Sequence, residues 1–258
     1  LEKIIVGMEP TSIYWEALAT YCKNNGMILV HVNPAAVHKS KELDDNDPSK
    51  NDRKDPKVIA DLVTDGRYSF PYMPEEEYAQ LRELSNLKIR TQESLTQCKN
   101  RLARWYSRYF PEFKEAYKNV VSKTAMIIMD MYPLPEDIVT LGVEGILQIW
   151  RNKKVRAAGE SRAKKLYEAA KNSIGRKEAA AVARLEFQSI KEDLDRYQGR
   201  LEAIDKEVDE ILPKIKNADK LFEIKGVGKA TVLTFLSEVG EISRFDNPKE
   251  IQKLAGYA

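Results

Sequence analysis

Two aspartates, Asp52 and Asp55, lie three residues apart in the stretch KNDRKDPKVIADLV. An apolar periodic segment begins directly after them, so they stand where a helix starts. An Asp at a helix N-cap, with an acidic residue three positions later, satisfies free N–H groups and suits the helix dipole. Two carboxylates one turn apart are also suited to a divalent cation. The spacing alone leaves a cap and a metal site open, with the cap as the simpler explanation.

Glu9 follows Lys3–Met8, a run rich in β-branched apolar residues that predicts a strand covered on both faces. Ser12–Asn25 predicts a helix and Met27–Val32 a second strand, so we expect a right-handed crossover and parallel pairing. Catalytic side chains favour strand ends in α/β sheets, although a solvated Glu is the more ordinary explanation. The stretch NPAAVHKSKELDDNDPSK that follows is polar, and we expect it to be irregular.

Lysine and arginine gather in one stretch of the chain. Residues 151–177 hold ten of them against two glutamates, although the net charge of the whole chain is only +2. A charge run is usually a solvated face, but this excess favours contact with a polyanion, with counterion release supplying affinity. The candidate nucleic-acid contacts in this stretch are Arg151, Lys153, Lys154, Arg156, Arg162, Lys164 and Lys165.

A second basic stripe comprises Lys99, Arg101, Arg104 and Arg108. Trp105 and Tyr106 lie within it, and they either stack on bases or, as is more common at this spacing, belong to a core.

The segment LFEIKGVGKATVLTFLSEVG, residues 221–240, predicts a helix, a Gly-Val-Gly turn and a second helix. Glycines allow a tight turn, and N–H groups at a helix start can hold a phosphate. This is the helix-hairpin-helix pattern, with Lys225, Gly226, Gly228 and Lys229 as candidate nucleic-acid contacts. An ordinary αα-turn stays the alternative, because Val232 stands where a small Ala usually permits close helix contact.

Two long segments carry heptad patterns typical of a coiled coil. A helix over about 77–109 would be roughly 50 Å long at 1.5 Å per residue, so it needs a partner, within the chain or in another subunit. The first seam, which two polar residues weaken, runs through Leu81, Leu84, Lys88, Thr91, Leu95, Cys98, Leu102, Trp105 and Tyr109. The second runs through Ala180, Ala183, Phe187, Ile190, Leu194, Tyr197, Leu201, Ile204, Val208 and Ile211.

Composition excludes some classes of protein. The 258 residues are 43% apolar and 32% charged, which predicts a globular chain of more than one domain. No long uncharged apolar run is present, so we expect no membrane span and a cytoplasmic location. The two cysteines, Cys22 and Cys98, lie too far apart to suggest a zinc site. Both ends of the sequence read as cuts through a larger structure.

The motifs together resemble the DEDD transposases of insertion sequences, the RNA-guided bridge recombinases. The resemblance is carried, in order, by GMEPTSIYWEALA, KNDRKDPKVIADL, KNRLARWYSRYFPEF, LPEDIVTLGVEGILQIWR, the heptads, IKGVGKATVLTFLSEVGEISRF and LAGYA. It implies an α/β RNase H-like (RuvC-like) partial domain over 1–70 and a mainly α region with a coiled coil over 71–215. Residues 216–258 would begin a C-terminal transposase domain with the helix-hairpin-helix segment.

The resemblance also implies site residues and partners. Glu9, Asp52 and Asp55 match three of four catalytic acids that hold Mg²⁺, while the first aspartate and a nucleophilic serine match no residue here. We therefore expect this chain alone to be inactive. Pro56 departs from the more usual Ala, and because Pro belongs in a first turn, the aspartates should sit at or before the helix start.

Two classes of function remain. The first is a transposase that exchanges DNA strands under a structured guide (bridge) RNA, assembled as a homo-oligomer, dimer or tetramer, and associated with a bacterial or archaeal nucleoid. The second is a non-catalytic nucleic-acid-binding and oligomerisation protein whose acidic residues only cap and solvate.

Overall fold

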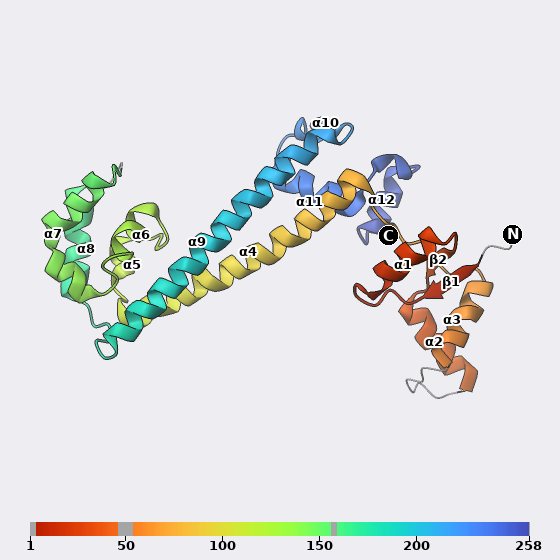
Figure 1. Ribbon diagram of the computed structural model, residues 1–258, viewed down its shortest axis with the longest axis horizontal. Helices are drawn as coiled ribbons and strands as arrows, with labels where there is room; N and C mark the ends of the chain where they lie inside the picture. The colour runs from red at the N-terminus through yellow and green to blue at the C-terminus, as the bar shows by residue number, and fades with distance from the viewer. Residues whose placement is uncertain (1–3, 46–53, 156–158, 258) are drawn as a thin grey trace. The chain divides into compact units, whose positions relative to one another are not determined.

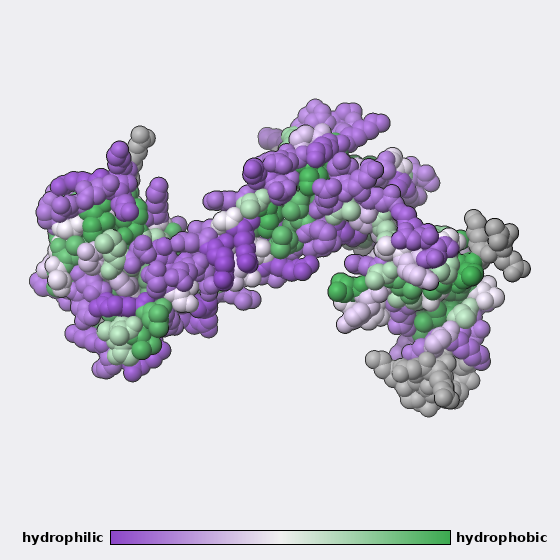
Figure 2. Space-filling view, viewed as in Figure 1, coloured by the Kyte–Doolittle hydropathy of each residue, from purple (hydrophilic) through white to green (hydrophobic). Residues whose placement is uncertain are grey.

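The computed structural model describes residues 4–45, 54–155 and 159–257 (Figure 1). The chain is mostly helical with a small sheet, and it forms two compact units, Leu1–Pro74 and Glu75–Ala258. Within the described residues, no helix has the length and apolar character that a membrane crossing requires. The visible surface of the helical unit is largely hydrophilic (Figure 2).

The N-terminal unit contains the predicted strand–helix–strand element. β1 (Ile5–Met8) and β2 (Ile28–His31) pair in parallel, in a register that sets Met8 opposite His31, and α1 (Tyr14–Asn24) connects them. The parallel pairing is confirmed. Parallel strands need such a crossover connection, because a two-residue hairpin joins only antiparallel strands.

Most of the stretch expected to be irregular is instead a helix, α2 (Pro34–Asp45), and residues 46–50 of it lie outside the described residues. The backbone N–H of Ala35 donates to Asn33 Oδ1 at 2.8 Å, and Pro34 supplies a φ that suits a first turn. The prediction of irregular structure was wrong because this Asn-Pro start signal outweighs a polar composition. α3 (Lys54–Thr64) follows and lies against β1, where Cγ2 of Val63 would be only 2.6 Å from a Cβ added at Gly7.

Two long helices form the axis of the second unit. α4 (Glu76–Tyr109) and α9 (Ala180–Ile211) pack side by side and run antiparallel (Figure 1). Trp105 Nε1 donates to the carbonyl of Ala183 at 2.9 Å, and near the other end Lys88 pairs with Asp205. The two heptad seams therefore meet within one chain. Lys88, a polar residue of the first seam, has its ion partner on the facing helix.

Between α4 and α9, the described residues form four helices: α5 (Phe113–Ala116), α6 (Lys123–Met129), α7 (Pro135–Asn152) and α8 (Glu160–Lys171). Their core continues that of α4, since the ring of Phe113 stacks on Tyr106 with centroids 4.4 Å apart. Trp105 is 2% exposed and Tyr106 is fully buried. Stacking of these two rings on bases is thus ruled out in this structure, and the core alternative is correct.

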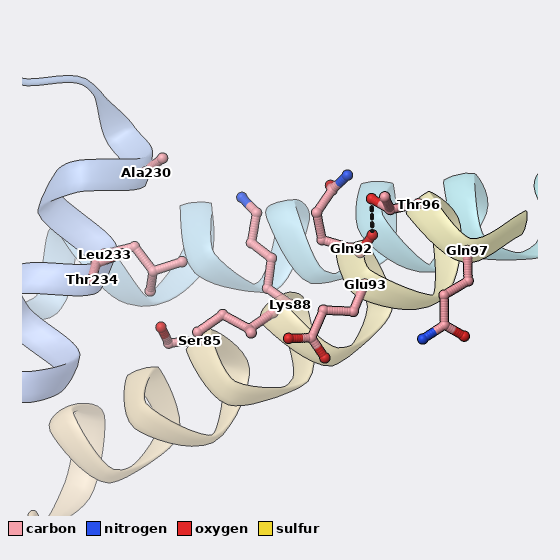
Figure 3. A pocket seen from close by; sticks show the side chains of 10 residues that line it. Ser85, Lys88, Gln92, Glu93, Thr96, Gln97, Ala230, Leu233 and Thr234 are labelled. Atoms are coloured by element: carbon pink, nitrogen blue, oxygen red, sulfur yellow. Dashed lines mark hydrogen bonds between the residues drawn. The ribbon is translucent and has the colours of Figure 1, made fainter. Parts of the chain in front are cut away.

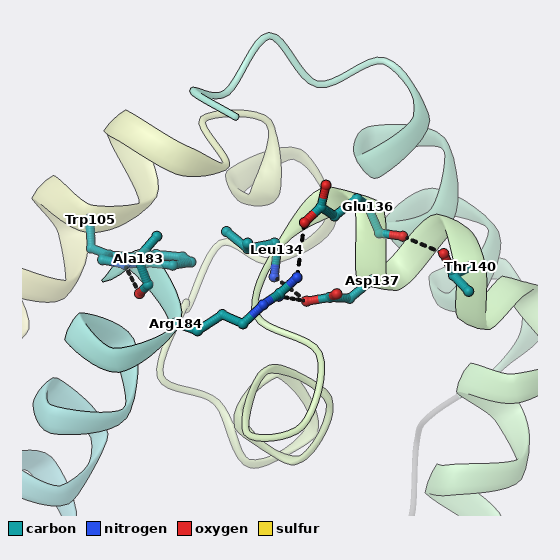
Figure 4. Close-up of polar contacts among 7 residues, drawn as sticks. All are labelled: Trp105, Leu134, Glu136, Asp137, Thr140, Ala183 and Arg184. Carbon is teal, nitrogen blue, oxygen red and sulfur yellow. Dashed lines mark hydrogen bonds and ion pairs between the residues drawn. The ribbon is translucent and has the colours of Figure 1, made fainter. Parts of the chain in front are cut away.

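A polar contact ties α7 to α9 (Figure 4). The guanidinium of Arg184 pairs with Asp137 and lies 2.9 Å from Glu136 Oε1. Asp137 Oδ2 also accepts the backbone N–H of Leu134 at 3.1 Å, so it caps the start of α7 while it holds Arg184. This contact joins the first turn of α7 to the first turns of α9.

The C-terminal elements pack at the other end of the pair. They are η1 (Leu212–Lys214), α10 (Ala218–Phe222), α11 (Lys229–Val239), η2 (Ile242–Arg244) and α12 (Pro248–Leu254). Val232 and Leu236 of α11 share a buried cluster with Leu81 and Val208. Residues of α4, α9 and α11 therefore form one core.

The buried seam makes a stability prediction. Leu194 is 2% exposed and Leu185, on the same helix, is 70% exposed. Leu194→Asp should lower the free energy of unfolding by several kcal/mol, because it buries an unpaired carboxylate. Leu185→Asp should change it by less than about 0.5 kcal/mol. Urea unfolding followed by circular dichroism measures both, and equal losses would contradict the seam assignment.

Candidate acidic site and nucleic-acid interface

Glu9 directly follows β1 and is half-buried. β1 touches α3, since a Cβ at Gly7 would lie 3.0 Å from Cγ2 of Ile59. Glycine at this position removes the side chain that would separate strand from helix. Asp55 lies one turn before Ile59 on the same helix. Glu9 and Asp55 thus come from two elements in direct contact.

Asp55 is the second residue of α3, in the first turn rather than before it. Its carboxylate pairs with Lys41 of α2, and the side chains are 28% and 11% exposed, respectively. Asp52 lies outside the described residues. The described residues contain no group of three His, Cys, Asp or Glu side chains placed to hold a metal ion. Convergence of Glu9, Asp52 and Asp55 therefore stays a prediction.

His31, which the sequence did not single out, lies opposite Met8 in the sheet, one residue from Glu9 along β1. The ring of Trp15 meets it edge-on with centroids 4.6 Å apart. Burial lowers the pKa of His31, so the imidazole is neutral at physiological pH. It adds no positive charge beside the strand end that carries Glu9.

The basic stripe of α4 divides between two faces. Arg101, Arg104 and Arg108 are exposed and recur at helical spacing, whereas Lys99 is half-buried on another face. Arg101 Nη1 lies 2.8 Å from Asp193 of α9. The Arg108 guanidinium lies 5.3 Å from the ring centroid of Tyr109. Two of these arginines therefore have partners inside the protein.

The described residues of the second basic group are all exposed. They lie at the end of α7, just after it, and on α8: Arg151, Lys153, Lys154, Arg162, Lys164 and Lys165. Two of them have acidic partners on their own helices, Arg151 with Glu144 at 2.9 Å and Lys164 with Glu160 at 2.7 Å. Such exposed pairs are weak and leave the cation available to a polyanion. Arg156 lies outside the described residues.

The glycine turn joins α10 to α11. Gly226 has φ of +89°, a conformation that favours glycine, and Gly228 is the N-cap of α11. Lys225 and both glycines are exposed. Lys229 turns inward, with Nζ 2.7 Å from Asp209 Oδ1 and 2.9 Å from the carbonyl of Asp205. The structure thus separates Lys229 from the other predicted contacts of this turn.

A groove of about 530 Å³ lies between α4 and α11 (Figure 3). Ile89, Ala230 and Leu233 give it an apolar lining, and the Thr96 hydroxyl donates to the Gln92 carbonyl at 2.8 Å. None of the predicted site residues lines it.

A carboxylate that the sequence did not indicate holds the loop between α8 and α9. Glu112 accepts hydrogen bonds from the backbone N–H of Ile174, at 3.0 Å, and from the Ser173 hydroxyl. The next residue, Gly175, packs so closely on Tyr109 that a Cβ would meet its carbonyl oxygen at 2.0 Å. Burial alone would raise the pKa of Glu112, but the two hydrogen bonds hold it below its ordinary value.

Two family models match the chain. One, a transposase model for DEDD enzymes of the IS110 type, matches residues 1–111, and one described as the Transposase IS116/IS110/IS902 family matches residues 218–258. The chain belongs to the IS110 family of DEDD transposases. No curated protein matches it.

The family assigns the coarse function. An IS110-family transposase is a DNA transposase or recombinase that binds DNA, and DEDD transposases generally use divalent metal ions. The first match covers the N-terminal unit and α4, and the second covers α10, α11, η2 and α12. Residues 112–217, with the basic stretch and α9, lie outside both matches.

The Lys41–Asp55 pair of this transposase can be tested by local stability. Lys41→Met leaves a half-buried carboxylate unpaired, which costs about 1–3 kcal/mol. Amides of α3 should then exchange hydrogen roughly 10 to 100 times faster, as that free energy implies. Lys39→Met, an exposed neighbour on α2, is the matched control. Equal exchange in the two variants would contradict a structural role for the pair.

Glu112 predicts an acid-sensitive loop. Because its folded pKa lies below the ordinary value of 4.5, ionised Glu112 stabilises the fold above that pH, and this contribution is lost as pH falls through the lowered pKa. The amide of Arg176, which donates to the Arg108 carbonyl at 2.9 Å, should lose exchange protection over that range. In Glu112→Gln the protection should be weaker at pH 7 and less dependent on pH, and an unchanged profile would contradict this assignment.

Proposed function

We propose that this IS110-family transposase exchanges DNA strands under the direction of a structured guide RNA, at a magnesium site formed by Glu9, Asp52 and Asp55. The observation that carries the proposal is the pair of family matches, which lie in order on either side of an exposed basic region. A non-catalytic binding protein has no specific observation in its favour.

The donor set suits Mg²⁺, because carboxylate oxygens are the ligands that hard divalent cations prefer. A bound ion would supply Lewis-acid activation of a phosphoryl oxygen. Two neighbouring elements support two of these donors: Glu9 directly follows β1, and Gly7 of β1 contacts α3, the helix that contains Asp55. The further aspartate and the nucleophilic serine of the family resemblance are assigned to no residue of this chain.

RNA binding in this proposal rests on phosphate contacts. The exposed cations of α7 and α8 and the outward Arg104 would neutralise backbone charge, and Lys225 with Gly226 and Gly228 would form the helix-hairpin-helix contact. The α4–α9 pair serves as an intrachain coiled coil. Because its seam is satisfied within one chain, the proposed dimer or tetramer needs another surface.

The catalytic proposal is tested with the full-length protein, its RNA and two DNA duplexes. Asp52→Ala and Asp55→Ala should each abolish Mg²⁺-dependent strand exchange, since each removes a proposed metal ligand. Asp61→Ala, an exposed acid on α3, should leave it intact. Wild-type exchange by both the Asp52 and Asp55 variants would overturn the proposed site.

The RNA proposal is tested by salt dependence. Replacing Lys153, Lys154, Lys164 and Lys165 together by Ala should weaken RNA binding and flatten the plot of log affinity against log salt, because fewer counterions are released. Filter binding over roughly 50 to 200 mM salt measures the slope of log affinity against log salt. An unchanged slope would count against phosphate contact by this region.

A further inference from the structure

A polar cavity lies between the α5–α6 turn and the start of α8. Its volume is about 580 Å³, within the range of roughly 300–1,000 Å³ typical of small-molecule and cofactor sites. It belongs to the part of the chain that neither family model matches. The cavity is therefore a feature of the inserted helices and not of the matched transposase segments.

Three cations line this cavity: Lys118, Arg162 and Lys165. Lys118 and Lys165 make no ion pair with any described residue, and the Arg162 guanidinium lies 5.7 Å from the ring centroid of Tyr117. One acid, Glu115, lines the cavity with them. The lining is therefore net positive, unlike an exposed helix face on which Lys164 and Glu160 balance each other.

The remaining lining can hydrogen-bond a neutral polar group. Asn119 Oδ1 accepts the backbone N–H of Val121 at 3.2 Å, which leaves its amide N–H groups for another acceptor. Ser122 Oγ and Thr124 Oγ1 lie 3.4 Å apart and also line the space. Burial raises the pKa of Tyr117 to about 12, so its hydroxyl stays neutral and does not repel an anion.

We propose that this cavity holds one unpaired nucleotide of RNA, with its phosphate between Lys118, Arg162 and Lys165 and its ribose hydroxyl toward Asn119 and Ser122. The inference rests on the RNA binding proposed above and adds a specific site to it. Three cations that line one open cavity favour a single phosphate over the spread phosphates of a duplex. Hydroxyl and amide groups beside those cations favour RNA, whose 2′-hydroxyl both donates and accepts.

The test compares two triple variants with equal loss of charge. The pocket variant is Lys118→Gln, Arg162→Gln and Lys165→Gln, and the surface control is Lys153→Gln, Lys154→Gln and Lys164→Gln. If three cations bind one phosphate, the pocket variant should lose at least about tenfold in RNA affinity while the salt slope changes by only about 0.7, the value for one single-stranded phosphate. Three separate contacts would change the slope by about 2.

Two further measurements keep the test independent of folding. The double variant Lys118→Gln with Lys165→Gln leaves the contact of Arg162 with Tyr117 in place. It should lose less RNA affinity than the triple variant, again with a small change in salt slope, and its circular dichroism spectrum should be unchanged. RNA that carries 4-thiouridine should crosslink the unmodified protein within residues 117–124 or 161–165, which mass spectrometry locates.

The outcomes separate this site from the broader RNA proposal. A slope change of about 2 in the pocket variant, with a loss equal to the control's, would overturn the cavity while leaving charge-driven RNA binding in place. If neither triple variant changes affinity, both fail. An equal loss for DNA of the same sequence would overturn the assignment to RNA.

Discussion

The helical unit depends on the burial of one long apolar seam within a single chain. α4 has 34 residues and α9 has 32, and each would expose an apolar stripe for most of its length if it stood alone. Their antiparallel contact removes both stripes from water, with the ring of Phe187 packed 4.9 Å from Trp105 between centroids. Because α9 returns along α4, the described helices between residues 110 and 179 lie at one end of the pair, and the C-terminal helices pack at the other.

This constraint also decides which cations are available. A cation beside the seam finds an acid on the facing helix, as Arg101 does with Asp193 and Lys88 with Asp205. The residues of α8 lie outside the pair, and Lys164 has its acidic partner, Glu160, on the same helix. The basic stripe of α4 and the basic residues of α8 therefore differ in how available they are to a polyanion. α4 packs along α9, whose acidic residues face some of its cations, whereas α8 lies outside this pair.

The sequence predicts which positions of a helix or strand are apolar, but it does not predict which other element packs against them. The parallel strands and the buried positions Ala183, Phe187, Ile190 and Leu194 follow from spacing, because period fixes which face of an element is apolar. The same spacing does not say that α4 covers this face, nor that Trp105 and Tyr106 turn into a core instead of toward bases. α2 was missed because the side chain of Asn33 caps its start, and hydrophobic periodicity does not report a cap.

The candidate acidic site shows the same limit at the level of a single carboxylate. The sequence placed Asp55 at a helix start, where spacing cannot distinguish a helix cap from a metal ligand. The structure shows a further role, because the Asp55 carboxylate pairs with Lys41. A half-buried carboxylate needs a positive neighbour, and the ammonium of Lys41 supplies it when no divalent ion does. An ion at Asp55 Oδ1 would compete with Lys41 for the same oxygen. If Asp55 binds a metal ion, that binding would be coupled to the contact between α2 and α3 that Lys41 makes.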